Sequence, residues 1–269
     1  MTDFRTRPFQ FAGSWYPETL EEAESYWTPM QHPVAAKAVV CPHAGWMYSG
    51  RVAGMVYGKI QPADTYVVIG PNHTGQGKST TSLYAHGRWF LPETKIEIDE
   101  AFSDELMRTS EYISVDYEAH AREHSIEVQV PFLLLLNPAA KLVPIIMRDY
   151  DPDIFHDVGR SLAAVAKKLA DRRVLFVAST DMTHYESRST ASRQDQAAIE
   201  RILALDPDGL REIVDHLGIS MCGMGPTAAV LVAARAMGAS HAELLAYATS
   251  GDITKDNDSV VGYAGIVIT

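Results

Sequence analysis

Short aliphatic runs alternate with longer amphipathic stretches along this 269-residue chain. The short runs are apolar at successive positions, which is typical of strands buried on both faces of a parallel or mixed sheet. We predict such strands at Ala38–Cys41, Tyr66–Ile69, Leu142–Ile146, Val174–Ala178, Leu244–Ala248 and Val261–Ile268.

The longer stretches have helical spacing, and some carry start signals such as a proline in the first turn. The alternation of strands and helices predicts an α/β fold in one domain over residues 1–269, with a central, mostly parallel or mixed sheet covered by helices on both faces. Residues 82–98 do not follow this alternation of strands and helices. They predict a hairpin or sheet extension formed by Ser82–Ala85 and Trp89–Leu91. The predicted helices are Gly50–Ile60, Glu100–Arg108, Glu123–Leu136, Ile154–Ala170, Ser189–Ala204, Gly209–Leu217 and Pro226–Met237.

The charge and cysteine content narrows the range of partners and compartments. With 23 Lys+Arg against 34 Asp+Glu, the formal net charge of -11 argues against nucleic-acid binding, which needs clustered basic residues. Two cysteines cannot form a disulfide framework, so a reducing, cytoplasmic setting is expected. No window is apolar enough for a membrane span, and no signal peptide is expected. Small-molecule or peptide partners are favoured, and both a monomer and a homodimer fit this composition.

Histidines follow directly after several of the predicted strands. His43 follows the first (VVCPHAG), His73 the second (VVIGPNHTG), and Asp181 and His184 the fourth (VLFVASTDMTHY). Ligands of open α/β sheets bind beyond the carboxyl ends of the strands, where the loops converge. One such histidine is often only a hydrogen-bonded loop residue, but their joint placement favours a common pocket.

Cys222 lies in a glycine-containing turn (SMCGMGP) just before a predicted helix. A helix N-terminus favours the thiolate over the thiol, so we expect Cys222 to be ionised and able to bind metal or act as a nucleophile. The alternative is a small buried hydrophobic residue in a turn. Cys41 lies inside an apolar strand, and we assign it to the core.

The segment AREHSIEVQVPFLLLL places His124 and Glu127 three residues apart on a predicted helix, so that they share one face. The letters do not match HExxH, which excludes a zincin-type zinc site. A supporting role near the site, or substrate contact, is expected for both residues. Alternatively, Glu123 and Glu127 form a charged face at the start of the helix.

Two other features are given no functional role. NHTGQGKS (72–79) nearly matches a phosphate-binding loop, but asparagine replaces its first glycine and a strand, not a helix, follows. The remaining histidines are predicted to be ordinary surface residues: His32, His86, His120, His156, His216 and His241.

Taken together, the motifs FAGSWYP, PHAGWMYSG, GPNHTG, EHSIEVQVPFL, STDMTHY and CGMGP resemble the Memo family, in this order and over nearly the whole chain. That family includes the B component of the AmmeMemoRadiSam system and is similar in fold to class III extradiol ring-cleavage dioxygenases. The resemblance implies that His43, His73 and Cys222 are the metal ligands, with Asp181 and His184 beside them. In the dioxygenases a glutamate stands where this chain has cysteine.

The resemblance implies a non-haem Fe(II) dioxygenase or oxidase that acts on a small dihydroxy-aromatic substrate. Because a thiolate is a softer ligand than a carboxylate, Zn or Cu are also compatible with the ligand set. In this hypothesis His184 acts as acid and base, while Asp181 and His124 orient groups around the metal. The expected substrate contacts are Trp46, Tyr48, Asn72 and Glu127.

Two other hypotheses compete with the oxygenase. The first is a non-catalytic metal-carrying, peptide-binding or redox-signalling protein that retains the dioxygenase pocket. The second is a thiol hydrolase in which Cys222 and His184 lie within hydrogen-bonding distance and no metal separates them.

Overall fold

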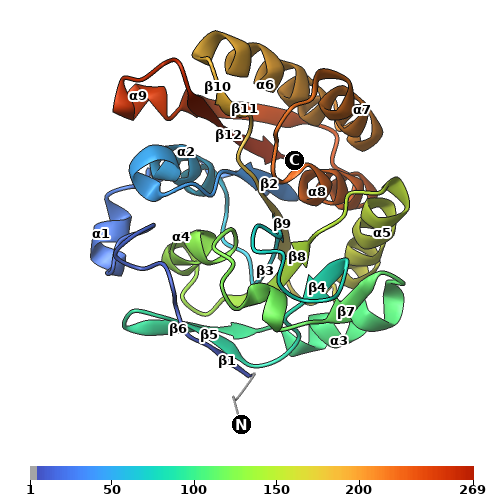
Figure 1. Ribbon diagram of the computed structural model, residues 1–269. Helices are drawn as coiled ribbons and strands as arrows, with labels where there is room; N and C mark the ends of the chain where they lie inside the picture. The colour runs from blue at the N-terminus through green and yellow to red at the C-terminus, as the bar shows by residue number, and fades with distance from the viewer. Residues whose placement is uncertain (1–4) are drawn as a thin grey trace.

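A single mixed sheet forms the centre of the computed structural model, which describes residues 5–269 (Figure 1). Its main path runs β1-β5-β6-β8-β3-β9-β2-β12-β10, with β11 paired to β12, and β4 and β7 attached at β8. The strands are β1 (Thr6–Arg7), β2 (Ala38–Cys41), β3 (Thr65–Pro71), β4 (Thr81–Leu83), β5 (Arg88–Leu91), β6 (Thr94–Ile98), β7 (Ile113–Val115), β8 (Lys141–Met147), β9 (Val174–Ser179), β10 (His184–Glu186), β11 (Ala242–Thr249) and β12 (Val260–Ile268).

Helices cover both faces of this sheet, as the sequence predicts for buried, doubly apolar strands (Figure 1). The α/β fold class is therefore confirmed. The α-helices are α1 (Leu20–Glu24), α2 (Trp46–Lys59), α3 (Glu100–Thr109), α4 (Val130–Leu136), α5 (Pro152–Lys168), α6 (Arg188–Leu203), α7 (Pro207–Leu217), α8 (Met224–Ala236) and α9 (Gly251–Thr254).

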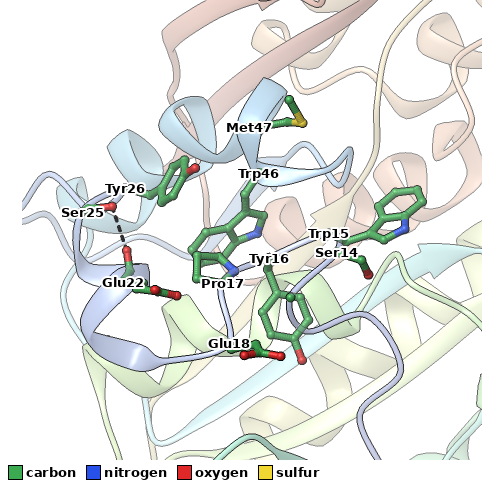
Figure 2. Close-up of a pocket in the computed structure, with 11 residues that line it drawn as sticks. Ser14, Trp15, Tyr16, Pro17, Glu18, Glu22, Ser25, Tyr26, Trp46 and Met47 are labelled. Atoms are coloured by element: carbon green, nitrogen blue, oxygen red, sulfur yellow. Dashed lines mark hydrogen bonds between the residues drawn. The ribbon is translucent and has the colours of Figure 1, made fainter.

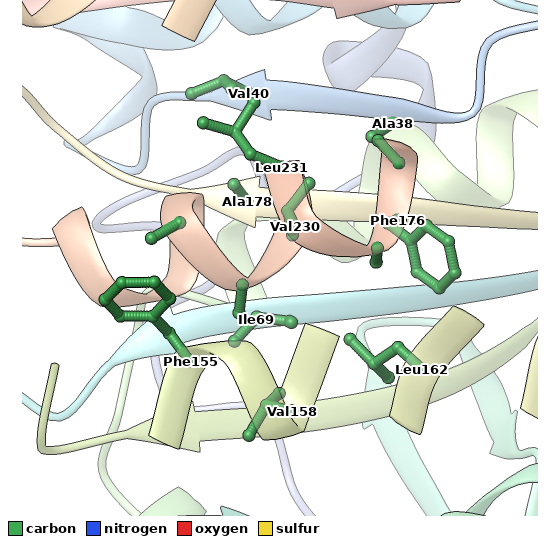
Figure 3. Close-up of a cluster of buried hydrophobic side chains, with 14 of the residues drawn as sticks. Ala38, Val40, Ile69, Phe155, Val158, Leu162, Phe176, Ala178, Val230 and Leu231 are labelled. Atoms are coloured by element: carbon green, nitrogen blue, oxygen red, sulfur yellow. The ribbon is translucent and has the colours of Figure 1, made fainter. Parts of the chain in front are cut away.

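The central strands β8, β3, β9 and β2 are mutually parallel, and their side chains divide between two cores. On β9, Phe176 and Ala178 face the core under α5 and α8, whereas Leu175 and Val177 face the core under α2 and α4. Figure 3 shows the first core, in which Phe155 and Val158 of α5 meet the sheet. These two cores fix the parallel strands rigidly, so their carboxyl ends form a stable platform for loops.

The helix predicted over Glu123–Leu136 is wrong in its first part. Residues 121–126 are turns and irregular backbone, Glu127–Gln129 is a short 3₁₀ turn, and the α-helix begins only at Val130. The Glu123 carboxylate accepts the backbone N–H of Ser125, a local bond that competes with helix formation. His124 and Glu127 consequently do not share a helix face.

Of the two alternatives predicted for residues 82–98, the sheet extension is confirmed and the hairpin between Ser82–Ala85 and Trp89–Leu91 is wrong. The antiparallel hairpin joins β5 to β6, while β4 pairs with β7 and β8 instead. Glu93 takes a positive φ of 65° in the connecting turn, a local conformation that the alternation pattern did not signal. In the part of the chain from residue 5 onward, no helix is long and apolar enough to cross a membrane.

Candidate metal centre

The ends of β2, β3 and β9 are neighbours in the sheet, since β9 pairs in parallel with both other strands. His43, His73 and Asp181 follow these strands directly and are thereby brought to the same edge. The loop before α8 brings Cys222 to them from a distant part of the sequence. The convergence at the carboxyl edge is the one that the sequence predicts.

His43, His73 and Cys222 form a compact group of potential metal ligands. Their donor atoms all lie within 4.8 Å of one another. His43 Nε2 is 3.2 Å from Cys222 Sγ. His43 is buried, Cys222 is partly buried, and His73 is exposed. Two imidazoles and one sulfur at this spacing are compatible with a single bound metal ion.

The second nitrogen of His43 identifies the tautomer of this ring. His43 Nδ1 lies 3.0 Å from Ser179 Oγ, which also accepts a hydrogen bond from Gln129 Nε2. The single hydroxyl proton of Ser179 is donated to the carbonyl oxygen of Ser125. His43 Nδ1 must therefore be the donor to Ser179, which leaves the lone pair of Nε2 directed toward Cys222.

Glu123 orients the His73 ring by accepting hydrogen bonds from His73. The Glu123 carboxylate lies 2.8 Å from His73 Nδ1 and also accepts the His73 backbone N–H. Because a carboxylate accepts, Nδ1 of His73 donates to it, and in the neutral ring the lone pair is then on Nε2. A carboxylate behind a histidine in this way is typical of metal-binding histidines, since it fixes the ring and makes it more basic.

Electrostatics favour a neutral His43 ring and a charged Glu123 carboxylate. Burial, and then the neighbouring His73, lower the pKa of His43 well below its ordinary value. Burial works against ionisation of Glu123, but the hydrogen bond from His73, with further contributions from its surroundings, outweighs burial and lowers the pKa of Glu123 to about 2. His43 is therefore unprotonated at neutral pH, which is the form that binds metal.

Cys222 departs from the state that the sequence predicts. Burial, and then the nearby Asp181 carboxylate, raise the pKa of its thiol, although Asp181 N–H donates to Sγ at 3.3 Å. The helix N-terminus thus does not ionise Cys222 by itself, and a bound cation would be needed to displace the proton. The imidazole in contact with the thiol is His43, whereas His184 Nδ1 bonds to the Ser220 carbonyl oxygen. This arrangement disfavours the thiol hydrolase hypothesis, which requires a hydrogen bond between Cys222 and His184.

A cavity of about 660 Å³ opens beside the ligand group. Several predicted site residues line it together: His43, His73, His124, Asp181, His184 and Tyr48. The His124 ring stacks on His73 at 4.6 Å between ring centroids and lies 4.1 Å from the Trp15 ring. Burial lowers the pKa of His124 to about 3, so this ring is neutral as well. His73, Glu123 and His124 also form a second, overlapping group of possible ligands.

Asp181 and His184 occupy different positions relative to this cavity. Asp181 Oδ1 accepts the backbone N–H groups of His43 and Ala44, so the carboxylate holds the loop that carries the first ligand. His184 is partly exposed, and its Nδ1 donates to the Ser220 carbonyl. That bond leaves Nε2 of His184 free to exchange a proton.

Glu127 is not placed at the cavity, contrary to the expected substrate contact. Its carboxylate forms a buried ion pair with Arg7 at 2.5 Å and accepts the backbone N–H groups of Gln10 and Phe11. The Tyr16 hydroxyl donates to it as well. Glu127 therefore anchors the N-terminal segment that brings Trp15 to the cavity wall.

Trp46 and Asn72 are also placed away from the cavity. The Trp46 ring is buried, stacks on Phe132 at 4.0 Å, and donates from Nε1 to the Val128 carbonyl oxygen. Figure 2 shows Trp46 among the residues that line an adjacent hollow. The Trp15 ring points away from Trp46 in this view. Asn72 Oδ1 accepts the Gly75 N–H, so that its amide shapes the loop after His73.

Sequence reasoning missed several supporting residues. Arg7 gives no signal in the pattern, and Glu123 is indicated only as part of a charged helix face, because charged residues usually lie at the surface. His120, which the sequence places at the surface, is completely buried, and burial lowers its pKa to about 3. Asp195 is buried too, and accepts the Thr183 N–H next to His184.

The fold and the site together define an α/β protein with a candidate His/His/Cys metal centre at the carboxyl edge of its sheet. The chain belongs to the Memo family: the model of that family, described as Memo-like protein, matches residues 7–267.

Curated relatives support this assignment. A MEMO1 family protein of Methanopyrus kandleri is 46% identical over 239 residues, which cover 87% of this chain and 84% of the relative. A MEMO1 family protein of Nitrosopumilus maritimus is 36% identical over 269 residues, covering 95% and 96% of the two chains. Among solved structures, an uncharacterised protein from Escherichia coli K12 matches with a TM-score of 0.59 and 15% identity, over 84% of this chain and 98% of that one, and supports the fold alone.

Proposed function

We propose that this chain binds one metal ion, in the first instance Fe(II), through His43, His73 and Cys222. The support is the tautomeric state of the two histidines, because Ser179 and Glu123 take the Nδ1 protons and leave both Nε2 lone pairs for a ligand. The thiol of Cys222 lies 3.2 Å from one of these nitrogens. Zn or Cu are the alternative metals, since a thiolate ligand suits them.

We propose further that the metal-loaded protein oxidises a small dihydroxy-aromatic substrate with dioxygen. When bound, Fe(II) would supply the redox and Lewis-acid chemistry that ring oxidation requires. The protein contributes a cavity of about 660 Å³ large enough for one aromatic ring, with aromatic walls that include Tyr48. His184 Nε2 is the group we assign to the removal of a hydroxyl proton from the substrate.

Metal content tests the first part of the proposal. Protein loaded anaerobically with Fe(II) should retain about one metal ion per chain, and His43→Ala, His73→Ala and Cys222→Ser should each lose most of it. The matched control is His86→Ala, because His86 pairs with Asp104 away from the site. Unchanged metal content in the three ligand variants would overturn the assignment.

Oxygen uptake tests the second part. The iron-loaded protein should consume oxygen with at least one member of a catechol panel, and His184→Ala should reduce the rate by about 100-fold or more while metal content is retained. Metal binding without any uptake would instead support the metal-carrying alternative.

A further inference from the structure

The cavity beside the candidate metal ligands has the aspartates Asp181 and Asp256 in its wall, and its described lining residues include no lysine or arginine. Asp181 is buried and holds the His43 loop through backbone N–H groups. Asp256 differs because it is exposed, lies in the segment between α9 and β12, and forms no ion pair with any described residue.

Two basic residues lie close to the Asp256 segment, Lys255 beside it in the chain and Arg188 through its bond to Asn257, and both are already occupied. Lys255 Nζ donates to the Asp252 carbonyl oxygen at 2.7 Å. Arg188 pairs with the Asp252 carboxylate at 2.6 Å and bonds to Asn257. Neither side chain lines the cavity. Among the described residues, the Asp256 carboxylate accepts one hydrogen bond, from the backbone N–H of Asp258.

Aromatic rings make up much of the remaining wall. Trp15, Tyr48, Tyr185 and Tyr263 line the cavity together with the Ser250 and Ser259 residues of the segments that flank α9. Tyr185 is 78% exposed and takes a positive φ of 60°, a costly conformation for a tyrosine that surrounding contacts must maintain. Aromatic faces beside a free carboxylate attract organic cations, and an anionic ligand would meet uncompensated repulsion.

We propose that the substrate is a dihydroxy-aromatic compound bearing a protonated amine, which Asp256 binds at the cavity mouth. This inference rests on the proposed function, since the ring hydroxyls would be directed to the metal end. Asp181, the other carboxylate of the cavity wall, is engaged by the backbone N–H groups of His43 and Ala44, so Asp256 is the carboxylate left to bind the amine.

The test compares three catechols that differ chiefly in the charge of the side group: 2-(3,4-dihydroxyphenyl)ethylamine, 2-(3,4-dihydroxyphenyl)ethanol and 3,4-dihydroxyphenylacetate. Binding to Fe(II)-loaded protein is measured by anaerobic calorimetry, which needs no turnover. The amine should bind about tenfold more tightly than the carboxylate, with the alcohol between them. In Asp256→Asn this ratio should fall to about twofold.

Asp258→Asn is the matched control, because it removes the same charge from the same segment without altering the cavity wall. It should retain the tenfold preference. Tighter binding of the carboxylate, or a preference that survives Asp256→Asn, would overturn the amine proposal while the proposed function stands. If the protein holds Fe(II) but binds none of the three catechols, the proposed function itself fails, and the amine proposal with it.

Discussion

Glu123 connects a predicted metal ligand to the body of the protein, and its effect can be isolated by one substitution. Glu123→Gln keeps the shape of the side chain but removes the charge that orients His73 and fixes its proton. We expect a loss of metal affinity of about 10–100-fold, measured by competition with a chelator. Glu118→Gln, at an exposed neighbour, should leave affinity unchanged. Equal affinity in both variants would contradict the role given to Glu123.

Glu127 stabilises the fold through its buried ion pair with Arg7 and does not contact the cavity. Glu127→Ala leaves the buried Arg7 guanidinium without its partner, so the free energy of unfolding should fall by about 3–5 kcal/mol in denaturant titrations. The same experiment on Glu118→Ala provides the comparison. A loss below about 1 kcal/mol would mean that the Arg7–Glu127 pair is not the anchor of the N-terminal segment.

The residues that the sequence could identify are those tied to a strand end. His43, His73 and Asp181 each follow an aliphatic run, so the α/β rule for ligand sites applied directly. Glu127 and Trp46 could not be placed in the same way, because their partners Arg7 and Phe132 are specified only by tertiary packing. The charge of a residue does not reveal whether it is solvated or paired inside the fold.

At the level of elements, the buried strands were predictable and the short connections were not. Strands such as Ala38–Cys41 are apolar on both faces, which predicts the burial that the structure shows. The segment before α4 has helical spacing, yet the Glu123 side chain bonds locally to Ser125 and prevents the helix from starting. The brief β10 strand arises from pairing with β12 and has too few residues for a periodic signal.

The turn before α8 needs a residue without a side chain at position 223. A Cβ atom there would lie 2.4 Å from Thr180 Cβ and 2.7 Å from the Ser179 carbonyl oxygen. Gly223→Ala should therefore displace the loop that carries Cys222 and lower the free energy of unfolding by about 1–3 kcal/mol. Metal affinity should fall in the same variant. Normal stability and affinity, measured by calorimetry, would contradict this close packing.

For the whole molecule, neutral histidines in the interior make stability depend on pH. Burial lowers the pKa of His120 to about 3, whereas the unfolded chain binds that proton near its ordinary value. Between about pH 6.5 and 3 the unfolded state therefore binds more protons, and the free energy of unfolding falls as the pH falls. His124 adds to the same trend.

Replacement of His120 should weaken this pH dependence in metal-free protein. Below pH 6.5, His120→Gln should reduce the slope of unfolding free energy against pH by about 1.4 kcal/mol per unit. The measurement is a series of urea titrations between pH 7 and 4. An identical slope in both proteins would show that His120 is not buried in its neutral form.

The ligand set of the metal is the central claim, and X-ray absorption spectroscopy of the Fe(II)-loaded protein tests it most directly. The fine structure should require one sulfur neighbour at about 2.3 Å together with imidazole nitrogens at about 2.1 Å. In Cys222→Ser the sulfur contribution should disappear. A spectrum from the unsubstituted protein that contains no sulfur neighbour would contradict the assignment of His43, His73 and Cys222 as the metal centre.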